Sequence, residues 1–154
     1  MSKDESALMR QFLEAEIARL SAVIGLTGSD VPDFVQRDGA WPFMVVAEDG
    51  ALRYLAVERG QLVHEQATRD PAELLYWAFS SATYRLASRW VLKHPRDDEE
   101  QRVTRWRRQA TLLHAIHPEW AERWRAELIE RLSDRDDHQL VPALPPPPLV
   151  LDPR

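Results

Sequence analysis

Apolar residues recur at three- and four-residue spacing near the start of the chain. Between Lys3 and Ile24 they fall on one helical stripe, and Gly25 stands where such a helix would end. The members of the stripe are Met9, Leu13, Ile17, Leu20 and Ile24. We therefore predict an amphipathic helix, followed from Leu26 to Ala40 by a loop that contains Gly, Pro and three Asp.

The pattern then changes to short apolar runs separated by turn residues. The runs PFMVVA (42–47) and LRYLAVE (52–58) flank Glu48-Asp49-Gly50, which is typical of a hairpin turn. Arg59-Gly60 predicts a second turn, and a weaker third strand follows over 62–68. Together these segments predict a three-stranded antiparallel meander.

Helical spacing returns after Asp70-Pro71, a typical helix start. The apolar positions that follow predict a long, centrally placed helix from Pro71 to Lys93. Two more helices are predicted, one from Val103 to Ile116 and one from Trp120 to Leu132. The acidic run Asp97 to Glu100 precedes the first of them, and we expect Asp97 or Asp98 to cap it.

These elements predict an α+β fold with an N-terminal helix, a three-stranded antiparallel meander and then three C-terminal helices packed on the sheet. At 154 residues the chain has the size of one domain, which we place at residues 1–133. Residues 134–154 include four consecutive prolines and are predicted to form an extended tail.

Composition narrows the function classes. The chain has no cysteine, so it has no disulfides and no thiolate chemistry. It has neither a signal-peptide pattern nor an apolar run long enough to span a bilayer, and we expect a cytoplasmic protein without membrane contact. Net charge is −5, and residues 1–70 carry twelve acidic but only seven basic side chains. An acidic first half favours a basic partner over nucleic acid.

Candidate chemistry is sparse. His114 and His117 lie three residues apart on a predicted helix, but no third ligand follows at a known metal-site spacing. Carboxylates are plentiful, and the pattern singles out no pair for acid-base work. Nucleophile elbows and Gly-rich phosphate loops are absent. We predict no catalytic residues, no metal and no cofactor.

A basic patch interleaved with an aromatic residue lies at the start of the third predicted helix. Arg102, Arg105 and Arg108 follow one another at three-residue spacing, while Trp106 shares a face with the apolar positions. Nucleic-acid binders use such a composition, but the acidic balance of the chain argues against it. We expect these arginines to form internal salt bridges or to bind a partner's acidic groups.

The order of segments in the second half resembles the family called immunity protein 63. In that family a VERG-like turn leads to a Leu-Leu-Tyr-Trp helix, and then come an acidic segment with Arg, a Gln-x-x-Leu-Leu helix and a Trp-x-x-Arg helix. The matching positions span about 50–132 and are Glu58, Arg59, Gly60, Glu73, Leu74, Leu75, Tyr76, Trp77, Arg102, Gln109, Leu112, Leu113, Trp120 and Arg123. The acidic C-terminal ending of the family is replaced here by DRDDHQ and the proline tail.

The resemblance implies a bacterial protein that binds the toxin domain of a polymorphic toxin and blocks its active site, as a monomer or weak dimer. Combined with the acidic first half, it makes carboxylates of that half the candidate toxin contacts. These are Asp30, Asp33, Asp38, Glu48, Asp49 and Glu58. Two other classes stay open from the residues alone: a hydrolase-like enzyme, which requires a pocket of converging titratable groups, and a nucleic-acid-binding regulator that uses the three arginines.

Overall fold

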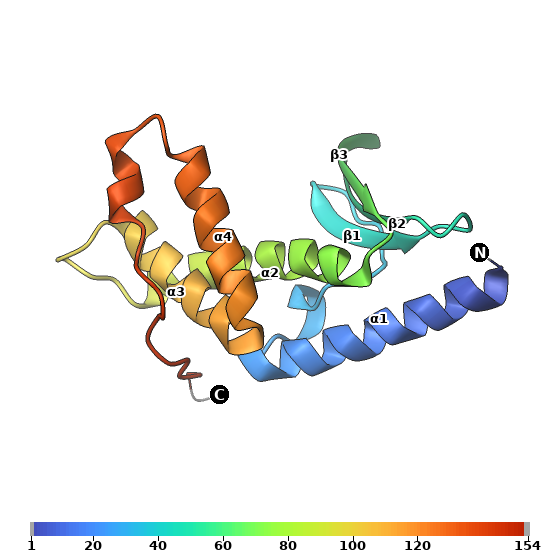
Figure 1. The fold of residues 1–154 in the computed structure, drawn as a ribbon, viewed down its shortest axis with the longest axis horizontal. Helices are drawn as coiled ribbons and strands as arrows, with labels where there is room; N and C mark the ends of the chain where they lie inside the picture. Colours follow the sequence, from blue (N-terminus) through green and yellow to red (C-terminus); the bar gives the residue numbers. More distant parts are fainter. Residues whose placement is uncertain (1, 153–154) are drawn as a thin grey trace. The chain divides into compact units, whose positions relative to one another are not determined.

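Along the chain, one α-helix precedes a single three-stranded sheet and three α-helices follow it, as the sequence predicts. The computed structural model describes residues 2–152 and confirms the α+β class (Figure 1). Its elements are α1 (Lys3–Ile24), η1 (Gly28–Asp30), β1 (Trp41–Val46), β2 (Leu52–Glu58), β3 (Gln61–Thr68), α2 (Pro71–Lys93), α3 (Gln101–Ile116), α4 (Pro118–Arg131) and η2 (Asp136–Leu140).

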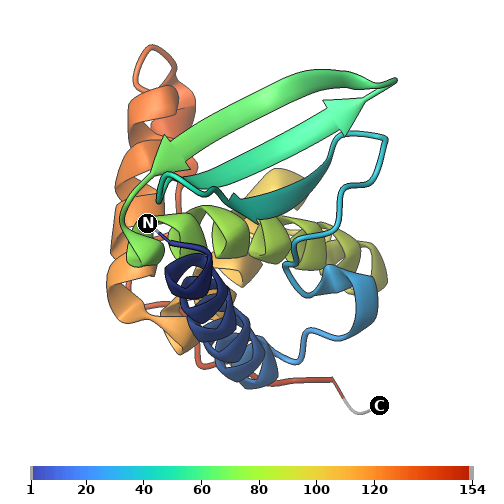
Figure 2. The ribbon, with the colours of Figure 1, turned by 90° about the vertical axis from the view of Figure 1, so that its right-hand side faces the viewer.

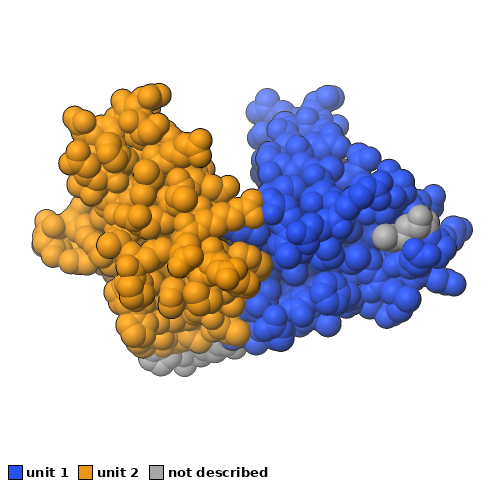
Figure 3. All heavy atoms as spheres, viewed as in Figure 1, with its two compact units in different colours: residues 1–22, 26–79 blue, residues 23–25, 80–154 orange. Residues whose placement is uncertain are grey.

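The chain divides into two compact units, coloured separately in Figure 3. Unit 1 consists of Met1–Ala22 and Leu26–Phe79, and unit 2 consists of Val23–Gly25 and Ser80–Arg154. Unit 1 therefore holds most of α1, the sheet and the first turns of α2. The rest of α2 belongs with α3, α4 and the C-terminal segment in unit 2.

The sheet of unit 1 is an antiparallel meander in the order β1-β2-β3. Along β2 the buried residues Leu52, Tyr54 and Ala56 alternate with partly exposed ones, as expected for a strand with one face on the core. α1 and the first turns of α2 lie on one face of the sheet (Figures 1 and 2). The predicted stripe of α1 faces this core, since Leu13 and Ile17 are buried.

Unit 2 is a helical unit in which α3 packs against α4. Leu112 and Leu113 of α3 are fully buried, and Trp124 of α4 is 5% exposed. The buried amide of Gln109 donates to the Ser80 carbonyl (3.0 Å) and to Thr83 Oγ1 (3.2 Å), which ties α3 to α2. A buried amide that is hydrogen-bonded in this way fixes the register between two helices.

The acidic run before α3 does not cap the helix. Glu100 occupies the N-cap position, and its side chain makes no capping hydrogen bond. Asp98 forms instead an ion pair with Arg96 (2.7 Å), and Glu99 accepts from Arg107 (2.7 Å). The prediction that Asp97 or Asp98 caps α3 is therefore wrong, because the helix begins after Glu100 and Asp98 is paired with Arg96.

The C-terminal segment of unit 2 lacks helix and strand from Val141 to Asp152, but it makes specific contacts. Val141 is only 5% exposed, and the Pro142 carbonyl accepts from Arg125 Nε (2.8 Å). Asp137, in η2, pairs with Arg102 (2.9 Å). Residues of the predicted tail thus contribute to the packing of unit 2.

Candidate functional site

The six acidic residues proposed as contacts fall into three groups within unit 1. Glu48 and Asp49 form the β1–β2 turn, while Asp38 and Glu58 lie near the β2–β3 turn, at the opposite end of the strands. Asp30 and Asp33 belong to the segment that precedes β1. The fold therefore distributes these carboxylates around the sheet and does not gather them into one cluster.

At the β1–β2 turn, the two carboxylates differ in what they do. Asp49 Oδ1 accepts from the Ala51 N–H (2.9 Å), and this hydrogen bond lowers the pKa of Asp49 below its ordinary value. The Asp49 carbonyl accepts from Arg69 (2.9 Å). Glu48 is exposed and makes no ion pair with the residues that the structure describes. Asp49 thus shapes the turn, and Glu48 is available to a partner.

The β2–β3 turn needs two residues with positive φ, Arg59 (52°) and Gly60 (74°), a geometry typical of tight hairpins. Asp38 Oδ1 accepts a long hydrogen bond from the Gly60 N–H (3.4 Å). The Ala40 N–H donates to the Val57 carbonyl (2.8 Å), which fixes the loop beside the strand end. Glu58 stays exposed at the end of β2.

Asp33 is partly buried and paired with a neighbouring arginine. Two hydrogen bonds from the Arg37 guanidinium (2.7 and 3.0 Å) hold it, and the Val35 N–H donates a third (3.1 Å). Partial burial would raise the pKa of Asp33, but the bonds from Arg37 and Val35 hold the pKa below its ordinary value. Its negative charge is largely offset by Arg37.

Strand β3 exposes more apolar surface than its sequence suggests. Six of its eight residues are exposed, including Leu62 (53%) and Val63 (52%). Figure 2 shows β3 as the outermost strand of the sheet. The sequence predicts a strand over 62–68, but strand periodicity cannot tell an edge strand from a covered one.

The three arginines of α3 are engaged within unit 2. Arg102 makes ion pairs with Glu100 (2.7 Å) and Asp137 (2.9 Å). Each of the three also lies over an aromatic ring, at 4.5 to 5.4 Å from the centroid. The pairs are Arg102 with Trp106, Arg105 with Tyr84, and Arg108 with Trp90. Such cation–π pairs stabilise the packing of the helices and leave less of each guanidinium for a phosphate.

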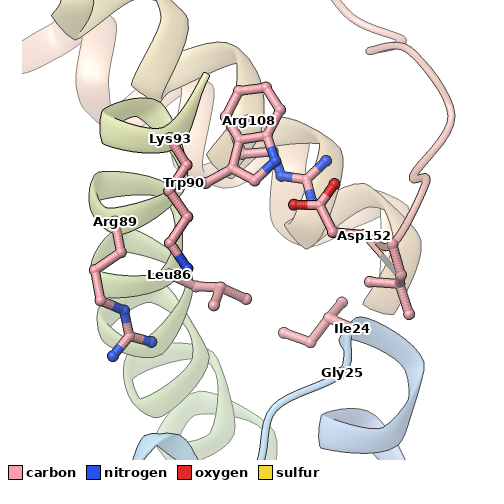
Figure 4. Close-up of a pocket in the computed structure, with 9 residues that line it drawn as sticks. Ile24, Gly25, Leu86, Arg89, Trp90, Lys93, Arg108 and Asp152 are labelled. Carbon is pink, nitrogen blue, oxygen red and sulfur yellow. The ribbon is translucent and has the colours of Figure 1, made fainter. Parts of the chain in front are cut away.

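A hollow of about 430 Å³ lies beside the stacked Arg108 and Trp90 (Figure 4). Ile24 and Leu86 point into it, and Lys93 and Asp152 lie at its border. Burial lowers the pKa of Arg108, an effect that the charge of Asp152 partly offsets. The hollow combines an apolar floor with scattered charges, and its lining contains no pair of carboxylates.

The described part of the chain contains no cluster of side chains that could hold a metal ion. Within residues 2–152, no three His, Asp or Glu side chains are grouped closely enough to hold a metal ion. His117 stacks on Trp120, with ring centroids 5.1 Å apart, which gives it a packing role. None of the helices described is long and apolar enough to cross a bilayer.

The positions that resemble a known family have mainly structural roles. Leu74, Leu75 and Tyr76 are buried in unit 1, and Gln109 connects two helices of unit 2. Arg59 and Gly60 form the tight turn described above. These residues identify a scaffold, and its partner surface must be sought among exposed residues.

Comparison with known proteins identifies the family to which this scaffold belongs. No curated protein and no solved structure was found to match the chain. Residues 48–130, more than half of the chain, match the family described as Immunity protein 63. The matched segment runs from the β1–β2 turn through β2, β3, α2 and α3 into the last turn of α4. The chain belongs to the immunity protein 63 family.

Proposed function

We propose that the protein binds the toxin domain of a bacterial polymorphic toxin and neutralises it by covering its active site. Membership in the immunity protein 63 family carries this proposal. Stoichiometric occlusion requires a stable scaffold and a complementary surface.

The charge of unit 1 supports a basic toxin surface as the target. Unit 1 contains 13 acidic and 7 basic side chains, which gives −6. Enzymes that act on nucleic acids have basic clefts, so a nuclease domain is the toxin class that this charge fits best. The contacts are proposed to come from the six acidic residues, with Glu48 and Glu58 first because both are exposed and make no ion pair with described residues.

Co-expression tests the function itself. The toxin domain encoded by the gene upstream of this one is expected to kill cells when expressed alone and to spare them when this protein is present. The purified pair should form a one-to-one complex in which toxin activity is lost. Continued killing despite expression of the folded protein contradicts the proposal.

Charge reversal tests the acidic surface. The double variant Glu48→Lys, Glu58→Lys is expected to weaken toxin binding about tenfold or more and to reduce its dependence on salt. The matched control is Glu119→Lys, Glu122→Lys, two exposed carboxylates of α4 in unit 2. If the two double variants bind equally well, with the same salt dependence as the parent, Glu48 and Glu58 are excluded as toxin contacts.

A further inference from the structure

The two edges of the sheet differ in how they are covered. On one edge, the Met44 N–H of β1 donates to the Asp33 carbonyl (3.0 Å), so the preceding loop takes up part of that edge. On the other edge, β3 pairs with β2 on its inner side, and no described residue pairs with its outer side. An open edge presents unsatisfied N–H and C=O groups that can accept another strand.

β3 lacks the residues that commonly protect an edge. Its sequence QLVHEQAT contains no Pro, Lys or Arg. Its one carboxylate, Glu65, is engaged by Arg53 on the neighbouring strand (2.9 Å). Proteins usually place lysine or proline on edge strands to prevent unwanted pairing. The one irregularity of this edge is a β-bulge at Val63, and the regular stretch from His64 to Thr68 is suited to a pairing that the protein uses.

The strand also provides apolar contacts beside the open edge. The register pairs Trp41 with Val57 and Val57 with Leu62, so these three side chains form a row across one face of the sheet. Val63 is the extra residue of a β-bulge, since Leu62 pairs with Val57 and His64 pairs with Ala56. The row therefore ends at the edge with Leu62 and Val63 both half-exposed.

We propose that the toxin domain docks on β3 by adding a strand to this edge, with its side chains packed on Leu62 and Val63. This inference rests on the proposed function. Main-chain pairing supplies affinity and the neighbouring side chains supply specificity in such complexes. Glu48 and Glu58 lie at the turns on either side of β2 and place negative charge near the ends of the same sheet.

Charge decides between a toxin and a second copy of this chain as the occupant. Pairing two β3 strands would bring together two units of net charge −6, and such like charges repel. A basic toxin domain has the opposite charge and is attracted to the same edge. The structure thus favours a partner other than the protein itself.

Lysine substitution tests the edge directly. Leu62→Lys and Val63→Lys each place a charge where a partner strand would pack, and each is expected to weaken binding to the toxin domain by about tenfold or more. The control is Leu92→Lys in unit 2, because Leu92 is 70% exposed and lies on a helix. It should bind like the parent. Binding would be measured by calorimetry with a catalytically inactive toxin.

Amide hydrogen exchange of the unsubstituted protein gives an independent measurement. Amides of β3 that exchange freely in the isolated protein are expected to become protected in the complex. If the toxin binds while β3 exchange and both lysine variants are unchanged, the edge inference fails and the proposed function stands. If the parent does not bind the toxin at all, the proposed function fails. A dimer that Val63→Lys abolishes would replace the toxin by a second copy.

Discussion

Units 1 and 2 differ in net charge, and their most prominent carboxylates differ in whether they are paired. Unit 1 has 13 acidic and 7 basic side chains, a net charge of −6, whereas unit 2 has 12 acidic and 13 basic ones, a net charge of +1. In unit 2 the longest acidic run is bound to arginines: Glu99 to Arg107 and Asp98 to Arg96. In unit 1, Glu48 and Glu58 are exposed at turns and make no ion pair with described residues.

The contrast shows that a run of acidic residues in the sequence need not form an acidic surface in the folded protein. The run Asp97–Glu100 is the densest negative segment of the sequence, yet several of its carboxylates hold the α2–α3 connection to α3. Isolated carboxylates at the turns of the sheet leave more charge for a partner. A surface for a basic partner is therefore better identified from carboxylates that make no internal ion pair than from the number of acidic residues in a segment.

The largest expected loss of stability follows removal of the C-terminal segment of unit 2, whose carboxylate Asp137 is paired within that unit. A chain that stops after Asp134 loses the Asp137–Arg102 ion pair, the Pro142–Arg125 hydrogen bond and the burial of Val141. We expect the free energy of unfolding to fall by about 2 to 4 kcal/mol, measured by chemical denaturation.

Toxin binding through unit 1 should survive this truncation at temperatures where the shortened chain is folded. Asp137→Asn alone is the control for the ion pair and should cost less. Unchanged stability of the truncated chain would support a domain that ends at Ser133 and would contradict a packing role for the segment that follows.

A smaller, pH-dependent effect is expected from Glu99 of unit 2. Its carboxylate accepts from Arg107 Nη2 (2.7 Å) and Thr104 Oγ1 (2.8 Å), and the Arg107 hydrogen bond holds the pKa of Glu99 below its ordinary value. A lowered pKa contributes stability above the unfolded pKa, and that contribution is lost as pH falls through the folded pKa. Glu99→Gln should cost about 1 to 2 kcal/mol at neutral pH.

The difference between parent and Glu99→Gln should shrink as pH falls below the ordinary glutamate pKa and through the lowered pKa of the folded state, because the parent carboxylate then becomes protonated. Denaturation curves recorded from pH 7 to pH 3 measure it. Glu58→Gln in unit 1 is the matched control and should change stability little at any pH, because Glu58 is exposed and makes no ion pair with described residues. A constant difference across this range for Glu99→Gln would mean that the ion pair does not stabilise the fold.

The order and type of the elements could be predicted because each follows from local pattern. The stripe of α1, the alternation along β2 and the Asp70-Pro71 start of α2 are all properties of neighbouring residues. The family resemblance was equally accessible, since it rests on short motifs whose order is fixed along the chain.

The candidate site could be predicted only in part, because pairing between distant segments leaves no periodic signal. Asp137 meets Arg102 across 35 positions, and Arg108 approaches the Val150 carbonyl across 42. The Asp33–Arg37 pair is local, but charge alone does not distinguish a paired carboxylate such as Asp33 from the exposed Glu48. The open edge of β3 depends on which strands do not pair, and no local pattern reports that.

The smallest expected effect on stability concerns the turn that joins β2 and β3. Here a substitution is expected to raise the free energy of unfolding, whereas the substitutions above lower it. Arg59 has φ of 52°, a left-handed conformation that costs most residues about 1 kcal/mol and that Asn adopts more easily. Arg59→Asn should therefore raise the free energy of unfolding by about 0.5 to 1 kcal/mol.

The Arg59→Asn substitution also removes one positive charge from unit 1, which should strengthen binding to a basic toxin slightly. Arg59→Lys keeps both the charge and the strained backbone, so it should leave stability and binding unchanged. If Asn and Lys at this position give the same stability, backbone strain at the turn is not what the substitution relieves.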